Sequence, residues 1–289
     1  MLVFSGIDRD LLETYRLLMA EYGISLKKEA GQHVLLNAEA LSYMVESAEI
    51  RTPDSVLEVG PGPGNLTEKL VERRPRQLTL VERDPRFVRL LRDRFGGYEW
   101  IEIVRGNALR ILPDAQHSVM VSNPPYGISS RLVVKTVLSE FDRVILTFQS
   151  EFGRRLTAEP GTRSYGSLSV LTQLRYKVRP LAILRASAFY PRPKVDTVML
   201  RFDSRKPPDE ELRLLKGLLP HIFANRKKTL RAPLKSWLRG FLQMDPDAIS
   251  SVLESCPVPI DERVYKLSPE QYAKLASFLK VIVRERRGR

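Results

Sequence analysis

Apolar side chains recur at helical spacing near the beginning of the sequence. Between residues 8 and 22 they return every three or four positions, and Gly23 ends the pattern. Asn37 is suited to be the N-cap of a second helix, because its side chain can accept a hydrogen bond from the first turn. The chain is therefore expected to open with two helices.

From residue 55 onward, short apolar runs alternate with helical patterns. Strands are expected at 55–59, 77–81, 100–104, 118–122 and 143–148, and helices at 65–74, from Asp84–Pro85 onward and near 130–139. Short strands separated by helices are typical of an α/β fold with a parallel, doubly wound sheet. Such a sheet binds ligands in the loops that follow the carboxyl ends of its strands, so candidate site residues are expected there.

The pattern changes at the polar, proline-containing segment 204–209, "SRKPPD". Beyond it we expect helices alone. The chain therefore divides into three expected parts: an N-terminal helical extension at 1–29, a Rossmann-like domain at 30–205 and a small helical C-terminal domain at 206–289.

The charge balance indicates a polyanionic partner. Lysine and arginine number 47 against 34 acidic residues, which gives a net charge of +13 and a pI near 9.9. Nucleic acid is the usual partner of such a protein, although a genome that favours arginine produces the same balance. We expect no membrane span, no secretory signal and, with Cys256 alone and only three histidines, no disulfide framework or metal site. A cytoplasmic protein fits best.

A glycine-rich turn follows the first expected strand of the sheet. In "LEVGPGPGNLTEKL", Gly60, Gly62 and Gly64 let a ligand approach the backbone at the start of a helix. A dinucleotide is disfavoured, because Asn65 replaces the last small residue of the fingerprint and two prolines in the loop lack N–H donors for a pyrophosphate. A cofactor without phosphate, S-adenosylmethionine, fits better.

Glu82 ends the next expected strand, in "LVERD". An acid at this position accepts hydrogen bonds from ribose hydroxyls in nucleotide-binding α/β proteins. The alternative is a tight turn followed by a surface acid paired with Arg83 or Arg86.

The segment "NPPY" at 123–126 follows the strand expected at 118–122. Its two prolines stop the strand and stiffen the loop, which would orient the Asn123 side chain and the Pro124 carbonyl as acceptors beside the flat ring of Tyr126. A planar heterocycle with an exocyclic amino group suits this arrangement. It indicates direct methyl transfer without a covalent intermediate or a metal. The alternative is a stiff loop with a surface tyrosine.

Seven motifs together resemble the ribosomal RNA adenine N(6),N(6)-dimethyltransferase family. In chain order they are "GQHVLLN" (31–37), "EVGPGPGNLT" (58–67), "NPPYGISS" (123–130), "FQSEFGRRL" (148–156), "YGSLSVLTQ" (165–173), "SAFYPRPKVDT" (187–197) and "IFANRKKTLR" (222–231). The resemblance covers about 30 to 285, and the "GQH" start is more similar to the archaeal and eukaryotic branch.

The resemblance implies a class I methyltransferase that uses S-adenosylmethionine and releases S-adenosylhomocysteine. Its substrate would be two adjacent adenosines in the 3′-terminal hairpin of small-subunit rRNA, dimethylated in the immature subunit during ribosome maturation. A monomer that uses no metal is expected.

The resemblance also assigns the site. The cofactor would be held by His33, Leu35, Gly60, Gly62, Glu82, Asn107 and Asn123. The target base would meet Asn123 and Pro124, with its faces stacked between Tyr126 and Phe189.

Two positions depart from the family pattern. Asn107 stands where an aspartate is usual, so weaker cofactor binding is expected. Pro124 stands where leucine or isoleucine is usual, as in DNA amino-methyltransferases, which leaves the nucleic-acid substrate open.

Basic residues form the expected RNA-binding surface, since lysine and arginine contacts to phosphates provide affinity that falls with salt. They are Arg154, Arg155, Arg192, Arg226, Lys227, Lys228 and Arg231. A solvated basic face is the alternative for any one of them. Two other functions also remain: a DNA adenine or cytosine amino-methyltransferase, favoured by Pro124, and a non-catalytic RNA-binding or transcription factor with the same fold.

Overall fold

The computed structural model describes residues 1–26, 31–112 and 116–287, and it divides them into two compact units. The first comprises Met1–Gly153 and Val178–Ser204, and the second comprises Arg154–Lys177 and Arg205–Arg289. Residues 154–177, assigned from the sequence to the central domain, thus group with the C-terminal helices. The reason is packing: Tyr165, for example, donates a hydrogen bond to the Leu267 carbonyl at 2.9 Å.

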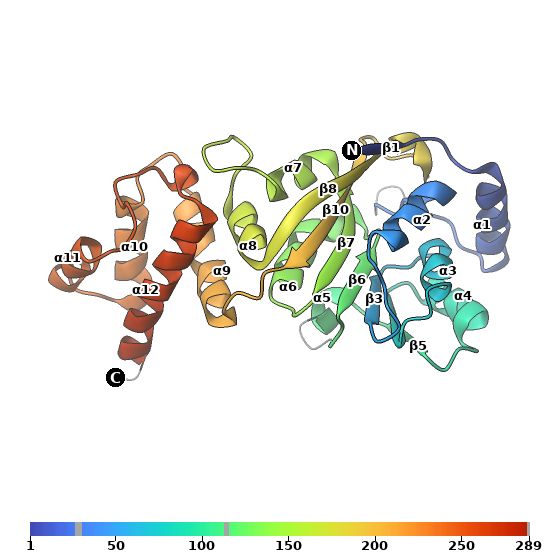
Figure 1. The fold of residues 1–289 in the computed structure, drawn as a ribbon, viewed down its shortest axis with the longest axis horizontal. Coiled ribbons are helices and arrows are strands. Elements are labelled where there is room, and N and C mark those ends of the chain that lie inside the picture. The colour runs from blue at the N-terminus through green and yellow to red at the C-terminus, as the bar shows by residue number, and fades with distance from the viewer. Residues whose placement is uncertain (27–30, 113–115, 288–289) are drawn as a thin grey trace. The chain divides into compact units, whose positions relative to one another are not determined.

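The first unit is built on an eight-stranded sheet, seen in Figure 1. In spatial order its strands are β1 (Leu2–Phe4), β8 (Tyr176–Leu184), β10 (Thr197–Ser204), β7 (Arg143–Gln149), β6 (Val119–Ser122), β3 (Ser55–Val59), β4 (Gln77–Glu82) and β5 (Ile101–Arg105). The five strands predicted from the sequence are β3 to β7, and they pair in parallel. The doubly wound prediction is confirmed, with the addition that β10 pairs antiparallel to β7.

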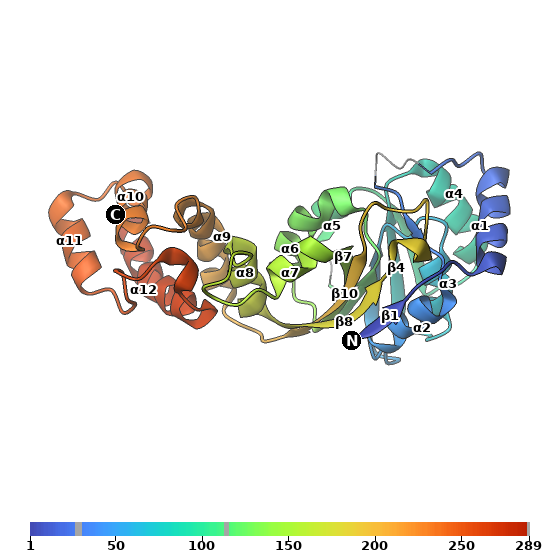
Figure 2. The same cartoon turned by 90° about the horizontal axis from the view of Figure 1, so that it is seen from above.

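Helices cover the sheet because each turns one apolar face toward it. They are α2 (Ala38–Glu46), α3 (Asn65–Val71), α4 (Pro85–Phe95), α5 (Ala108–Ile111), α6 (Ser129–Val137) and α7 (Ser150–Leu156). Figure 2 shows α2 and α3 on one side of the sheet and α5 and α6 on the other. Completely buried Leu41, Val56, Leu80 and Val121 belong to the core between these layers.

The N-terminal extension does not form a separate part. Strand β1 pairs in parallel with β8, and α1 (Arg9–Glu21), capped by the Asp8 side chain, shares a hydrophobic cluster with α4. Tyr15 and Met19 of α1 lie in this cluster with Phe87 and Leu90. Residues 1–26 therefore belong to the first unit rather than to an independent extension; residues 27–29, assigned to the same extension, lie outside the described residues.

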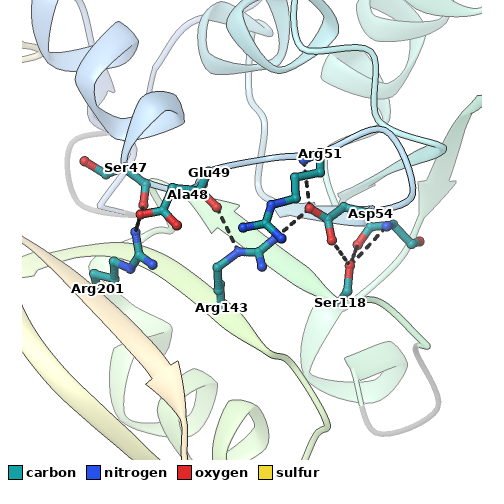
Figure 3. Close-up of polar contacts among 9 residues, drawn as sticks. Ser47, Ala48, Glu49, Arg51, Asp54, Ser118, Arg143 and Arg201 are labelled. Carbon is teal, nitrogen blue, oxygen red and sulfur yellow. Dashed lines mark hydrogen bonds and ion pairs between the residues drawn. The ribbon is translucent and has the colours of Figure 1, made fainter.

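A polar network ties the loop before β3 to the sheet (Figure 3). Asp54 accepts hydrogen bonds from the Arg51 backbone N–H at 2.8 Å, the Arg143 guanidinium at 2.5 Å and the Ser118 hydroxyl at 2.9 Å. Arg201 binds the Ser47 carbonyl at 2.7 Å and the Glu49 carboxylate at 2.5 Å. These contacts lie at the amino ends of β3, β6 and β7, the ends opposite to the loops expected to carry the site.

The second unit contains α8 (Ser167–Arg175), α9 (Asp209–Phe223), α10 (Arg231–Leu242), α11 (Pro246–Glu254) and α12 (Pro269–Arg287). Its core includes Leu215, Leu219, Tyr272 and Leu275, all completely buried. The expectation of helices beyond residue 206 agrees with this structure. The remaining short elements are β2 (Val34–Leu35), η3 (Tyr126–Ile128), η4 (Ala186–Ala188), β9 (Phe189–Tyr190) and η5 (Val264–Lys266).

Candidate cofactor and base-binding site

A cavity of about 830 Å³ opens at the carboxyl ends of β3, β4, β5 and β6. Its volume is in the range of small-molecule sites. The position follows from topology: β4 and β5 lie on one side of β3 and β6 lies on the other, so the loops diverge at β3 and leave a crevice. Six residues expected from the sequence line it: His33, Gly60, Gly62, Glu82, Asn107 and Asn123.

The glycine loop approaches the "NPPY" loop closely at Gly60. Its φ of +68° favours glycine, and a Cβ there would lie 3.2 Å from Pro125 Cδ. The φ angle of Gly64 is also positive, at +87°. A Cβ at this position would lie 2.8 Å from the Phe95 ring. The loop backbone is thus pressed between Pro125 on one side and α4 on the other, where side chains would not fit.

Glu82 ends β4, and its carboxylate faces the glycine loop. One oxygen accepts from the Gly62 N–H at 3.2 Å, and the other accepts from the N–H groups of Arg83 and Asp84 at 2.6 and 2.8 Å. Burial raises the pKa of Glu82, while these three hydrogen bonds oppose the rise. The side chain is 8% exposed, so the alternative of a surface acid does not describe it.

A second acid, Glu58, lines the cavity and was not among the sequence-based candidates. It is 2% exposed on β3 and accepts a hydrogen bond from the Thr67 hydroxyl at 2.7 Å. Burial raises the pKa of Glu58 to about 8. A signal for it was present, because Glu58 interrupts the otherwise apolar run "SVLEV".

Asn107 follows β5 and caps α5, since its Oδ1 accepts from the Leu109 N–H at 3.1 Å. It is exposed at the cavity rim. The cap directs the carboxamide oxygen into the helix turn, so the Nδ2 group is the part of Asn107 suited to a cavity ligand.

The Asn123 carboxamide is held at both ends. Its Nδ2 donates to the His33 carbonyl at 3.1 Å, and its Oδ1 accepts from the Thr147 hydroxyl at 2.5 Å. Thr147 is completely buried on β7, and sequence reasoning did not identify it because a threonine inside an apolar strand carries no distinctive pattern. These two hydrogen bonds fix the orientation of the carboxamide, with Oδ1 toward Thr147 and Nδ2 toward the His33 carbonyl.

Tyr126 lies beside His33 rather than alone. The two rings stack with centroids 5.5 Å apart and planes inclined by 30°. His33 Nδ1 donates to the Pro191 carbonyl at 2.6 Å, and the Tyr126 hydroxyl shares a 2.6 Å hydrogen bond with buried Thr197. Burial raises the pKa of Tyr126, so its phenol stays neutral.

Three expected site residues have buried side chains. Leu35 is completely buried and Phe189 is 1% exposed, because they face each other across the β2–β9 pair within the hydrophobic core. Pro124 is also buried, and neither these three residues nor Tyr126 is among those that line the cavity. The expectation that Phe189 presents its ring to a base therefore disagrees with this structure, in which packing encloses that ring.

The basic residues fall into two groups. Arg154, Arg155, Lys227 and Lys228 of the second unit and Arg192 of the first are exposed. By contrast, Arg226 donates to the carbonyls of Arg163 and Thr162 at 2.6 and 2.8 Å and lies over the Tyr265 ring. Arg231 forms a two-pronged pair with Asp261, at 2.7 Å for each contact. These two guanidiniums have intramolecular roles.

Within the described part of the chain, no group of His, Cys, Asp and Glu side chains is arranged to hold a metal ion. In the same residues, no helix is long and apolar enough to span a membrane.

Comparison with known proteins agrees with this geometry. The family described as "Ribosomal RNA adenine dimethylase" matches residues 23–280. The probable ribosomal RNA small subunit methyltransferase A of Thermococcus onnurineus is 35% identical, over 91% of this chain and 96% of that protein. The corresponding protein of Latilactobacillus sakei is 31% identical, over 92% and 94%.

Two solved structures are also similar. A dimethyladenosine transferase from Plasmodium falciparum superposes with a TM-score of 0.70 at 28% identity, covering 86% of this chain and 98% of that one. The 23S rRNA methyltransferase ErmE gives 0.60 at 26% identity, covering 85% and 99%. The chain therefore belongs to the ribosomal RNA adenine dimethylase family.

Proposed function

We propose that this protein transfers methyl groups from S-adenosylmethionine to the amino groups of two adjacent adenosines in the 3′-terminal hairpin of small-subunit rRNA, giving N(6),N(6)-dimethyladenosines in the maturing subunit. Family membership supports adenine dimethylation, and the small-subunit methyltransferases among the relatives support this rRNA.

One observation carries the proposal: the glycine loop and the "NPPY" loop line the same cavity, and they approach so closely that a Cβ added at Gly60 would lie 3.2 Å from Pro125 Cδ. A methyl donor on the first loop and an amine on the second would meet with little further movement. Well-oriented reactants gain about 7–11 kcal/mol over free ones.

The cavity residues fit S-adenosylmethionine. At the cavity, the Glu82 carboxylate accepts hydrogen bonds from three N–H groups, and it would also accept hydrogen bonds from the ribose hydroxyls. Asn107 Nδ2 would be the group that binds the cofactor adenine, because its Oδ1 is used as the helix cap. When bound, the cofactor supplies an electrophilic methyl group.

Asn123 holds the target amine. Its Oδ1 takes one hydrogen bond from Thr147 and retains a second lone pair, which accepts one hydrogen of the adenosine amino group. The Pro124 carbonyl accepts the other hydrogen. In the first transfer both hydrogens are held, so the lone pair of the nitrogen would be directed toward the glycine loop, as in-line transfer requires. In the second transfer one hydrogen remains to be held, and each transfer releases one proton from the nitrogen.

Tyr126 supplies the stacking surface for the extruded adenine. Extrusion costs a few kcal/mol, and stacking on an aromatic ring recovers about 1–3 kcal/mol. The His33 ring, packed on Tyr126, keeps that surface in place. We assign Phe189 and Leu35 to support of this region through the β2–β9 pair rather than to contact with the base or cofactor.

The second unit and Arg192 supply contacts to the rRNA backbone. Exposed Arg154, Arg155, Lys227 and Lys228 are the phosphate-binding candidates there, whereas Arg226 and Arg231 are assigned to the stability of the unit.

The test is transfer of labelled methyl from S-adenosylmethionine to small subunits that lack the modification, followed by mass mapping of the rRNA. We expect dimethylation of two neighbouring adenosines near the 3′ end. Large-subunit rRNA and duplex DNA serve as parallel substrates, because the ErmE likeness and Pro124 point to them.

If large-subunit rRNA or duplex DNA were methylated and the small subunit were not, the proposed substrate would be wrong and the methylated nucleic acid would take its place. Binding of S-adenosylhomocysteine and rRNA without any transfer would indicate the non-catalytic alternative. The Asn123→Ala variant is the control for contaminating activity.

A further inference from the structure

The segment before residue 23 lies outside the family match, yet it contacts residues that support the cofactor loop. The link is Arg94 on α4. Its guanidinium donates to the Pro63 carbonyl within the glycine loop and forms an ion pair with Glu68 of α3. Arg94 thus holds the loop and the helix that follows it at two points.

Helix α4 also touches the loop directly. Gly64 lies so close to Arg94 and Phe95 that a Cβ would be 3.0 Å from the Arg94 Nη1 and 2.8 Å from the Phe95 ring. Displacement of Arg94 therefore changes the surface against which the loop rests. Pro63 lacks an N–H and Gly64 has no side chain, so Arg94 adds a side-chain contact to this part of the loop, beside the contact of Gly62 with Glu82.

Tyr15 of α1 covers the other side of Arg94. Its ring centre lies 5.5 Å from the Arg94 guanidinium carbon, and the side chain is only 1% exposed. Its hydroxyl interacts with the same guanidinium: burial raises the pKa of the Tyr15 phenol, and the charge and polar contact of Arg94 oppose the rise. Tyr15 therefore acts on Arg94 through both its aromatic face and its hydroxyl, and these contacts add to the restraint of a long side chain.

We propose that Tyr15 is a positioning residue for the cofactor: through Arg94 it fixes the carbonyl of Pro63 and so the shape of the glycine loop. The N-terminal segment is then part of the cofactor-binding apparatus of this chain. The proposal rests on the proposed function, because it concerns the same cavity.

The chain offers a matched control on the same two helices. Tyr22, at the end of α1, has Arg89 of α4 over its ring at 5.4 Å, and its hydroxyl donates to Asp93 at 2.8 Å. This second tyrosine–arginine pair joins α1 to α4 without a contact to the glycine loop. Its removal reports on helix packing alone.

The experiment measures the Kd of S-adenosylhomocysteine by calorimetry, together with the thermal midpoint of unfolding, for Tyr15→Leu, Tyr15→Phe, Arg94→Met and Tyr22→Leu. We expect Kd to rise about tenfold in Tyr15→Leu and Arg94→Met and by less in Tyr15→Phe, which keeps the aromatic face. In Tyr22→Leu it should stay within about twofold of the value for the unaltered protein. The Tyr15→Leu and Arg94→Met effects should not add in the double variant, because they act through one contact.

An unchanged Kd in folded Tyr15→Leu, or an equal loss in Tyr22→Leu, would overturn the positioning role. If Tyr15→Leu does not fold, the Kd values of Arg94→Met and Tyr22→Leu are compared instead. An equal loss of affinity in these two variants would again overturn the positioning role. Failure of the unaltered protein to bind S-adenosylhomocysteine would instead contradict the proposed function, so the two failures are distinguishable.

Discussion

The hydroxyl of Thr147, completely buried on β7, donates a 2.5 Å hydrogen bond to Oδ1 of Asn123 on the neighbouring loop. Strand β7 pairs with β6, so the residue that orients the carboxamide comes from the strand beside the one that carries it. We expect Thr147→Val to lower kcat about tenfold and Thr147→Ser to restore it, with the Kd of S-adenosylhomocysteine unchanged in both. Asn123→Ala should lose about 10²–10³ in turnover. Full activity of Thr147→Val would show that the carboxamide is oriented without the hydroxyl.

Tyr126 is expected to act through its ring. Tyr126→Ala should lower methyl transfer strongly, whereas Tyr126→Phe should keep most of it. The phenylalanine variant still loses the hydrogen bond to buried Thr197, which is worth about 1 kcal/mol of unfolding free energy. Single-turnover rates and urea unfolding measure the two effects separately. If Phe and Ala variants were equally inactive, stacking would not be the main contribution of Tyr126.

Glu58 makes stability depend on pH in a stated direction. Burial raises its pKa to about 8 in the folded protein, from an ordinary value of 4.5. Between these values the folded state binds more protons than the unfolded state, so stability falls as pH rises, by at most about 1.4 kcal/mol per pH unit. Glu58→Gln should make this dependence shallower and raise stability at pH 8. Some slope of the same sign should remain, because burial also raises the pKa of Glu82. An identical pH profile in the variant would contradict the buried, neutral Glu58.

Neighbouring basic residues in the second unit are expected to have different roles, some in RNA binding and others in stability. Replacing Lys227 and Lys228 with alanine is expected to weaken rRNA binding and reduce its salt slope by about 1–2, at an unchanged melting temperature. Arg226→Gln, which loses its contacts to two carbonyls, should lower the unfolding free energy by about 2 kcal/mol. If the lysine variant lost stability and the Arg226 variant lost only rRNA binding, these assignments would be wrong.

Asp54 is expected to matter for stability and not for the cofactor. It is 12% exposed and joins Arg51, Ser118 and Arg143 at the far end of the strands (Figure 3). We expect Asp54→Asn to lower the unfolding free energy by about 2 kcal/mol and to leave the Kd of S-adenosylhomocysteine unchanged. Glu72→Gln, which removes an exposed pair with Lys69, should change stability by less than about 0.5 kcal/mol.

The sequence predicted the central sheet well because its strands are short, apolar and separated by strong helix signals. The strand expected at 55–59 is β3, and the helix expected to begin after Asp84 is α4, with the Asp84 side chain as its cap. The strands of this sheet that were not predicted, β1, β8 and β10, lie beyond β7. Strand β8 contains Pro180 and two charged residues, and β1 is three residues long and largely exposed, so neither carries a clear alternating pattern.

Loop position in the sequence was enough to expect which residues lie at the cavity, whereas contacts between distant segments could not be expected from it. Glu82 and Asn107 follow strands, and that placement alone brings them to the cavity. Burial of Phe189 depends on β9 pairing with β2, more than 150 residues away, as shown by its register with Leu35. The partners of Asn123 and Arg226 likewise come from distant parts of the chain, which no local pattern specifies.

The pairing of β1 with β8 also has a consequence for the order of folding. Leu2 aligns with Ala182, so all the residues between them must be synthesised before this strand has its partner. Contacts between such distant residues form slowly, because a long loop must close first. During translation the backbone of β1 must therefore wait unpaired until β8 has been synthesised.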